Sequence, residues 1–271
     1  MLIVGDSPYW TRRLLSKHLQ VLGLQPGDAV MVHAALRSAG PILGGPDTLI
    51  GALLDVLGPE GTLLCYVNWE QQYEDAIDET GRLPETLKAD IPPFDPAASR
   101  ASRDHGAFAE FVRTTPGAYR SRNPGASVAA IGARAAWFTA DHPLDYGYGP
   151  GSPFDKLVVA NGKVLMVGAP LDTISLLHHS EHLAQLPNKR IRRMEVPLRF
   201  GNHVEWRMIE EFDTVDPVVN ELADDYFGTI VEEFLLTKGG QQGMIGSASS
   251  VLLSAPAVVS FAVQWLEQRY R

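Results

Sequence analysis

Cysteine is almost absent from this sequence of 271 residues, in which Cys65 is the single example. A lone cysteine cannot form an intrachain disulfide, so nothing in the composition points to an oxidising compartment. The apolar start of MLIVGDSPYW is broken at Gly5 and Asp6, which makes it too short for the hydrophobic region of a signal peptide. We therefore expect a cytoplasmic protein.

Long hydrophobic runs and an excess of positive charge are also missing. The most apolar late segment, 251–266, is interrupted by Ser254, Pro256, Ser260 and Gln264, which fits a strand, a turn and an amphipathic helix better than a membrane span. The net charge of −9 disfavours a nucleic-acid backbone as partner and favours a cationic small molecule. We expect neither a membrane nor a nucleic acid as partner.

The order of predicted elements indicates the fold class. A helix over 11–22 is followed by a buried strand over 28–36, a helix over 47–58 with Asp47 as candidate N-cap, and a strand over 62–69. This order is typical of an α/β domain with a largely parallel sheet flanked by helices. Further elements are expected as strands at 126–132, 163–169 and 205–213 and as helices at 106–114, 172–186 and 260–270. No composition break marks a linker, so 1–271 reads as one domain.

One segment has little periodicity. Residues 70–106 are rich in Pro, Asp, Glu and Arg. A stretch of this length without clear elements is usually a functional loop, and we expect it to cover the substrate as a lid.

The histidines in LLHHSEHLAQ, 176–185, support two hypotheses. His178 and His182 lie one helical turn apart with Glu181 between them, which is the pattern of an inverted zinc-protease motif. Such a site needs a third ligand, and several glutamates further along the chain qualify equally. Alternatively, His178 and Glu181 share one helical face and form a proton-transfer site without metal.

Three other residues or turns are candidates for chemistry. Cys65 lies in an apolar strand, where a cysteine is typically a core residue, although a Cys-His acyl-transfer pair stays open. The Gly44–Gly45 turn precedes a helix and can hold phosphate oxygens, or it is an ordinary turn. His33 ends the first buried strand, where α/β proteins bind ligands. Acidic and aromatic residues in YVNWEQQYED, EEFD and ELADDYF either face solvent or line a cation site.

Several segments together make the sequence resemble the aminoglycoside 3-N-acetyltransferases. From about residue 20 to the C-terminus these are GDAVMVHAALRSAGPILGGPDTLIGALLDVLGPEGTLLCY, PPFDPAAS, RSRNPGASVAAIG, HPLDYGYGPGSP, LMVGAPLDTISLLHHSEHLAQLPNKR and FAVQWLEQR. The resemblance implies a central mixed sheet, with acetyl-CoA and a cationic aminoglycoside in a shared cleft and no metal. A homodimer stays open, as do a zinc hydrolase and a CoA-binding protein acting on another amine.

The resemblance also assigns the catalytic residues. The family's L-H-x-x-E segment matches Leu177 to Glu181, which makes His178 the catalytic histidine and leaves His182 outside the pattern. A carboxylate, Glu181 or Asp172, would fix the tautomer of the base and stabilise the imidazolium. Acetyl transfer is then expected to be direct, within a ternary complex.

Binding residues follow from the same resemblance. The pyrophosphate of CoA would lie against the turn after the first strand, where Ala35 replaces a serine that relatives often carry. We expect CoA contacts at His33, Ala34, Ala35, Leu36, Arg37, Ser38, Gly45 and Arg120. We expect the ammonium groups of the aminoglycoside at Tyr66, Trp69, Glu74, Glu211 and Asp213.

Overall fold

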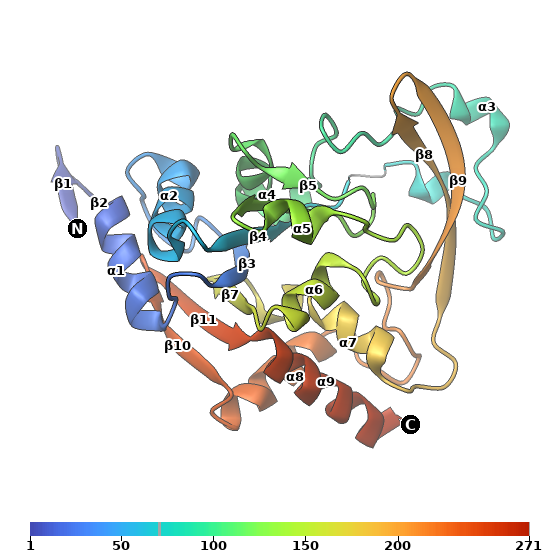
Figure 1. Ribbon diagram of the computed structural model, residues 1–271. Coiled ribbons are helices and arrows are strands. Elements are labelled where there is room, and N and C mark those ends of the chain that lie inside the picture. Colours follow the sequence, from blue (N-terminus) through green and yellow to red (C-terminus); the bar gives the residue numbers. More distant parts are fainter. Residues whose placement is uncertain (70–71, 271) are drawn as a thin grey trace.

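A seven-stranded mixed sheet forms the centre of the computed structural model, which describes residues 1–69 and 72–270 (Figure 1). Its order is β10-β11-β7-β3-β4-β6-β5. The strands are β3 (Ala29–Ala34), β4 (Thr62–Tyr66), β5 (Tyr119–Arg120), β6 (Val128–Gly132), β7 (Lys163–Val167), β10 (Gly240–Ile245) and β11 (Ala248–Ser254). The predicted α/β domain with a mixed sheet is confirmed.

The expectation of a largely parallel sheet is wrong. Only β3 runs parallel to its two neighbours, β4 and β7. The pairings β10 with β11, β11 with β7, β4 with β6 and β5 with β6 are antiparallel. Strands that are buried on both faces have the same apolar pattern in either direction, so the sequence could not distinguish the two arrangements.

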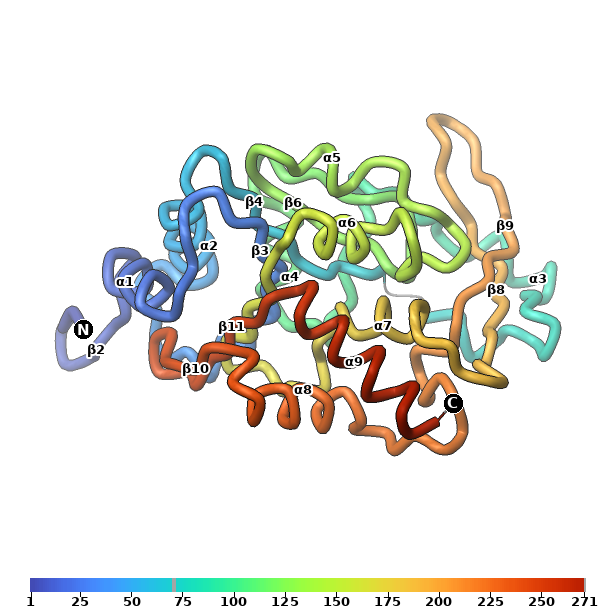
Figure 2. The backbone as a smooth tube through the Cα atoms, turned by 60° about the horizontal axis from the view of Figure 1, so that its bottom comes forward, coloured from blue at the N-terminus to red at the C-terminus, as the bar shows by residue number. Residues whose placement is uncertain are grey.

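The helices lie in two layers about the central sheet (Figure 2). Side chains of the central strands alternate between the two hydrophobic cores beneath these layers. Val30, Leu63 and Leu165 belong to the core cluster of α1 (Arg12–Leu22), α2 (Gly45–Leu57) and α4 (Gly106–Thr114). Their neighbours Met31 and Leu64 belong to the opposite core, beneath the remaining helices. These helices are α5 (Ala135–Thr139), α6 (Pro153–Val159), α7 (Leu177–Leu183), α8 (Tyr226–Leu236) and α9 (Ala255–Tyr270).

Three helix boundaries differ from the prediction. The α2 helix begins at Gly45, after Gly44 in a left-handed conformation, so Asp47 lies in the first turn and is not the N-cap. The predicted helix over 172–186 is divided into the 3-10 turn η3 (Leu171–Thr173) and the short α7. The predicted turn within 251–266 is absent, because α9 follows β11 directly.

A long hairpin of β8 (Ile191–Phe200) and β9 (His203–Phe212) stands at one end of the molecule (Figure 1). The sequence predicted β9 and missed β8. The expected lid contains only η1 (Glu74–Ala76), α3 (Glu85–Lys88) and η2 (Arg103–His105), and residues 70–71 lie outside the described part. It packs on the hairpin, where the Phe94 N–H donates to the Pro197 carbonyl at 2.8 Å.

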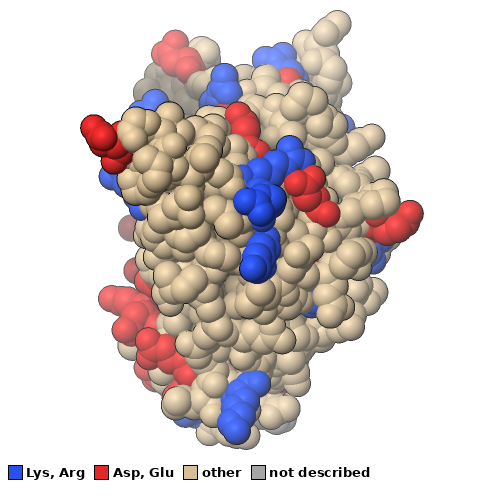
Figure 3. All heavy atoms as spheres, turned by 90° about the vertical axis from the view of Figure 1, so that its left-hand side faces the viewer, with Lys and Arg blue, Asp and Glu red and all other residues tan. Residues whose placement is uncertain are grey.

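The opposite end of the molecule carries the hairpin of β1 (Leu2–Val4) and β2 (Ser7–Tyr9), beside α1. On this face, charged side chains of both signs are scattered among uncharged ones (Figure 3). The acidic balance of the chain is therefore not concentrated there. Within the described ranges, no helix has the length and apolar character needed to cross a membrane.

Candidate active site

A cavity of about 630 Å³ lies where the parallel strands β4 and β7 end. Tyr66 and Trp69 line it from the end of β4, and Asp172 and His178 line it from the segment after β7. The hairpin contributes Glu211 from β9. The cavity therefore lies at the carboxyl edge of the parallel strands, which is the edge where α/β folds bind ligands.

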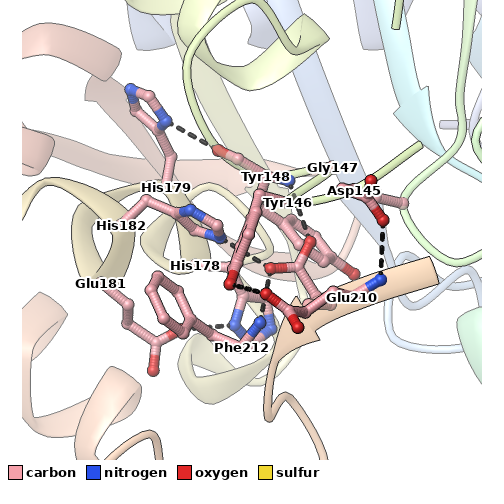
Figure 4. Close-up of polar contacts among 12 residues, drawn as sticks. Asp145, Tyr146, Gly147, Tyr148, His178, His179, Glu181, His182, Glu210 and Phe212 are labelled. Atoms are coloured by element: carbon pink, nitrogen blue, oxygen red, sulfur yellow. Dashed lines mark hydrogen bonds and ion pairs between the residues drawn. The ribbon is translucent and has the colours of Figure 1, made fainter. Parts of the chain in front are cut away.

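The half-buried His178 and the buried Glu181 form a hydrogen-bonded pair on α7 (Figure 4). Nδ1 of His178 lies 2.7 Å from Oε2 of Glu181, since residues three apart share one helical face. Glu181 is 1% exposed, and its Oε1 accepts a hydrogen bond from the hydroxyl of Tyr226 on α8. With Nδ1 engaged, Nε2 is the imidazole nitrogen that remains for a ligand in the cavity.

Aromatic rings fix the plane of the His178 imidazole. Its centroid lies 4.8 Å from that of Tyr148 and 4.8 Å from that of Phe227. The hydroxyls of Tyr148 and Tyr66 lie 2.6 Å apart, and the Tyr66 hydroxyl also donates to the Gly125 carbonyl. Burial raises the pKa of both phenols, so they stay neutral. Tyr66 was predicted as a site residue and Phe227 only as part of the segment ELADDYF, whereas Tyr148 was not singled out.

The rings of His178 and His182 point to separate carboxylates. His178 contacts Glu181, whereas Nε2 of His182 lies 2.8 Å from Oε1 of Glu211. The third histidine, His179, is buried with Nδ1 2.7 Å from the Tyr148 carbonyl. Among residues 1–69 and 72–270, no three His, Cys, Asp or Glu side chains are grouped to hold a metal ion. This arrangement fits the proton-transfer hypothesis and not the zinc motif.

Of the two acids proposed to orient His178, only Glu181 contacts the imidazole. Asp172 lies on η3, where it lines the cavity and is exposed. The thiol of Cys65 belongs to the core cluster with α1, α2 and α4, whereas Leu177 next to His178 belongs to the opposite cluster. The hypothesis of an acyl-transfer pair between Cys65 and a histidine of α7 is therefore wrong, because the sheet separates the two side chains.

The wall of the cavity is acidic. It is lined by the carboxylates Glu74, Asp104, Asp172 and Glu211, and by the cation Arg192. Arg192 lies 3.0 Å from Glu74, whose pKa is nevertheless raised by burial. Trp69, Glu74 and Glu211, which are expected to contact the aminoglycoside, all line this cavity, and so does Asp104, which was not predicted because it carries no periodic signal in a charged loop.

Asp213 was expected to contact the aminoglycoside, but it does not line the cavity. Its carboxylate is directed into its own loop, where it accepts the Val215 N–H at 3.0 Å, and it lies 3.9 Å from Nε of Arg190. It does not occur among the described residues that line the cavity, although Phe212 and Thr214 on either side do.

The turn predicted to bind CoA lies beside the cavity and not in its described wall. His33 ends β3 with its Nε2 buried, and burial together with the charge of His105 lowers the His33 pKa to about 4. The Ala35 N–H donates to Val167 at 3.0 Å, and Arg37 and Ser38 are exposed. His105 does line the cavity, and its charge acts on His33, so the turn after β3 lies near the cavity.

Two of the predicted phosphate contacts are used within the protein. Nε of Arg120 donates to Ser127 Oγ at 3.1 Å, and its terminal nitrogens donate to the carbonyls of Ser99 and Val67. Burial lowers the Arg120 pKa to about 9. The Gly45 N–H donates to the Ile42 carbonyl at 3.0 Å. The expected CoA contacts of the Arg120 side chain and the Gly45 amide are therefore not supported.

A second cavity, of about 1120 Å³, adjoins the first and was not foreseen. Both cavities are lined by Trp69, Gln72 and Ser102. The second also contains the cations Arg100, Arg103 and Arg199. Three carboxylates, Asp90, Asp95 and Glu110, line it too, so its wall is of mixed charge, and Arg199 lies 3.7 Å from Asp95.

Comparisons with known proteins agree with this geometry. The sequence model described as aminoglycoside 3-N-acetyltransferase matches residues 31–267. Aminoglycoside N(3)-acetyltransferase III of Pseudomonas aeruginosa is 46% identical over 256 residues, covering 93% of this chain and 91% of that protein. Aminoglycoside N(3)-acetyltransferase VII of Streptomyces paromomycinus is 39% identical over 271 residues, covering 98% and 94%.

Solved structures give the same result. The structure described as AAC-IIIb binary with CoASH has a TM-score of 0.96 and 59% identity, covering 97% of this chain and 98% of that one. The structure described as AAC-VIa bound to Sisomicin has a TM-score of 0.92 and 35% identity, covering 97% and 99%.

Proposed function

This chain belongs to the aminoglycoside 3-N-acetyltransferase family, and we propose that it transfers an acetyl group from acetyl-CoA to the 3-amino group of a 2-deoxystreptamine aminoglycoside. The observation that carries the proposal is the His178–Glu181 pair, 2.7 Å apart at the edge of an acidic cavity. The CoASH complex of AAC-IIIb supports the cosubstrate, and the sisomicin complex of AAC-VIa supports the acceptor. Acetylation removes a positive charge from the antibiotic, which is how the enzyme would confer resistance.

His178 acts as the general base in this proposal. The 3-amine is largely protonated near neutral pH, so Nε2 of His178 must accept a proton before the nitrogen can attack. Glu181 keeps the Nδ1–H tautomer and stabilises the imidazolium that forms, and the Tyr226 hydroxyl donates a hydrogen bond to Oε1 of Glu181. The contact at 2.7 Å supports Glu181 over Asp172 for this role.

Acetyl transfer is direct within a ternary complex. The amine nitrogen forms a bond with the thioester carbonyl carbon, the C–S bond breaks, and CoA leaves as a thiolate. The nitrogen loses its second proton as the amide forms, and the thiolate takes up one proton. Cys65 takes no part, because burial raises its pKa to about 12 and its side chain lies in the other core.

Two features support a polycationic acceptor. The carboxylates that line the cavity provide sites for ammonium groups, and Trp69 offers a ring face. Glu74 and Asp104 both come from the 72–106 segment, so the expected lid contributes directly to the acceptor site.

The turn over 35–38 is proposed to hold the phosphates of CoA, with Arg37 as counter-charge. Arg37 is exposed, and it lies in the turn that follows His33, on which the charge of the cavity residue His105 acts. Arg37→Ala should raise KM for acetyl-CoA several-fold and leave KM for the aminoglycoside unchanged, while the exposed Arg13→Ala on α1 serves as control. If Arg37→Ala is silent and Arg199→Ala raises KM for acetyl-CoA, the nucleotide lies in the second cavity.

The experiment for the whole proposal is thiol release from acetyl-CoA with gentamicin, tobramycin or neomycin as acceptor. Release should require both the antibiotic and His178, and NMR should show one acetyl group on the 3-amine. His178→Ala should reduce kcat by at least about 10²-fold. Absence of release from a folded protein that binds CoA would contradict the acceptor and point to another amine.

A further inference from the structure

The contact between His182 and Glu211 joins the base-bearing helix to the acidic wall of the cavity (Figure 4). We propose that His182 is a positioning residue that holds the Glu211 carboxylate where it binds an ammonium group of the aminoglycoside. The inference rests on the proposed function and assigns one carboxylate of its acceptor site.

Glu211 lines the cavity, and hydrogen bonds from other parts of the protein fix both of its carboxylate oxygens. Its Oε1 accepts hydrogen bonds from His182 Nε2 at 2.8 Å and from the Phe212 N–H at 2.7 Å, and Oε2 accepts a long one from Tyr148 N–H at 3.4 Å. The side chain is 21% exposed. A carboxylate has room for about four hydrogen bonds, so acceptor capacity remains on the cavity side.

Glu211 also differs from Glu74 in the charge that faces it. Glu74 shares its negative charge with Arg192 at 3.0 Å. In the described part of the chain, no lysine or arginine forms an ion pair with Glu211, whose partner is His182. No lysine or arginine of the described residues therefore competes for the Glu211 carboxylate, and a ligand ammonium can be its counter-ion.

The surroundings of His182 favour a fixed ring. Its side chain is 7% exposed, and its centroid lies 4.6 Å from that of Phe212 and 5.8 Å from that of Tyr146. Rotation of the imidazole away from Glu211 would leave the carboxylate without its side-chain donor. The ring therefore acts as a fixed donor.

The location explains why the contact matters for this reaction. His178 and His182 lie four residues apart on α7, so one helix sets the position of the base and of the donor to Glu211. Glu211 also contacts the backbone of Tyr148, whose ring packs on His178. An ammonium held by Glu211 is thus placed next to the amine that His178 deprotonates.

The test compares His182→Phe, His182→Gln, Glu211→Gln and the double variant His182→Phe/Glu211→Gln. Tobramycin binding is measured by calorimetry, and kcat and KM are measured for its acetylation. Loss of a hydrogen bond to a charged group predicts that His182→Phe raises Kd and KM for tobramycin roughly ten-fold. We expect kcat to change less than about three-fold. The amide of His182→Gln should restore much of the affinity, because it supplies an N–H donor.

The double variant separates a positioning role from a general packing role. If His182 acts through Glu211, the double variant binds no more weakly than Glu211→Gln alone. Additive losses overturn the proposal, as does a fall in kcat with unchanged KM. If His182→Phe does not fold, His182→Leu replaces it as the variant without a donor. Wild type is measured first, and a folded wild type that acetylates no aminoglycoside contradicts the proposed function itself.

Discussion

The imidazole of His178 is held by Glu181 from within the same turn of α7, with 2.7 Å between Nδ1 and Oε2. Nε2 of His178 is thus left to accept a proton from a ligand in the cavity, and the carboxyl group of Glu181 is buried. Glu181 therefore keeps the imidazole in the tautomer that can accept a proton at Nε2. The third member of a catalytic triad has the same role.

Glu181→Gln should lower kcat by about 10³-fold while KM for the aminoglycoside stays nearly constant. The amide keeps the shape of the side chain but cannot stabilise an imidazolium. Steady-state kinetics of thiol release measure the effect. Asp172→Asn is the matched control and should change kcat by less than a few-fold, since Asp172 does not contact the imidazole. The reverse order of effects would assign the orienting role to Asp172.

Tyr226→Phe should lower kcat by about ten-fold without raising KM. Burial raises the pKa of the Tyr226 phenol, so the hydroxyl remains a donor to Glu181. Its removal leaves a buried carboxylate oxygen with one donor fewer, which makes the anion less stable. Tyr119→Phe, at an exposed site, is the control. Equal kinetics for both variants would show that the contact with Tyr226 is not used.

Much of this site could be predicted because its two central residues are neighbours in sequence. The spacing of His178 and Glu181 places them on one helical face whatever the rest of the fold does. The residues that complete their environment come from distant elements, with Tyr148 before α6 and Tyr226 on α8. No periodic pattern relates such positions, so only tertiary structure could identify them.

The fold was predictable to the same extent. Short apolar runs such as those around Met31 and Leu64 identified buried strands, but pairing direction depends on contacts between distant segments. The β8 strand was missed because the adjacent Arg192 and Arg193 and the proline Pro197 interrupt the alternation of apolar and polar residues that identifies a strand. Its partner β9 also lies outside the main sheet. The sequence also could not show whether Arg120 binds a phosphate or stabilises the fold. Only the structure identifies the three oxygen atoms within the protein to which its guanidinium donates.

Cys65→Ala should leave kcat within about two-fold of wild type and lower the free energy of unfolding by about 1 kcal/mol. The thiol is buried at 4% exposure, and burial raises its pKa to about 12, so it is neither ionised nor accessible. Iodoacetamide at pH 8.5 should therefore modify it only after denaturation, as measured by mass spectrometry. Rapid modification of the native protein with loss of activity would revive an acyl-cysteine route.

The buried His142 should cause the free energy of unfolding to fall as the pH is lowered from 6.5 towards 4. Burial lowers the pKa of His142 to about 4, although its hydrogen bond to the Gly147 carbonyl opposes the shift. The unfolded chain binds a proton near pH 6.5, whereas the folded chain does so only near pH 4. The stability contributed by the neutral ring is therefore fully present above pH 6.5. It is lost as the pH falls towards 4.

The variant that isolates this effect is His142→Asn, because asparagine does not titrate. Urea unfolding at several pH values between 7 and 4 should show that its stability deficit relative to wild type shrinks by up to about 3 kcal/mol as the pH falls. His33 should keep contributing in both proteins, since burial also lowers its pKa to about 4. Parallel curves for wild type and His142→Asn would mean that His142 takes up its proton equally in the folded and unfolded chains.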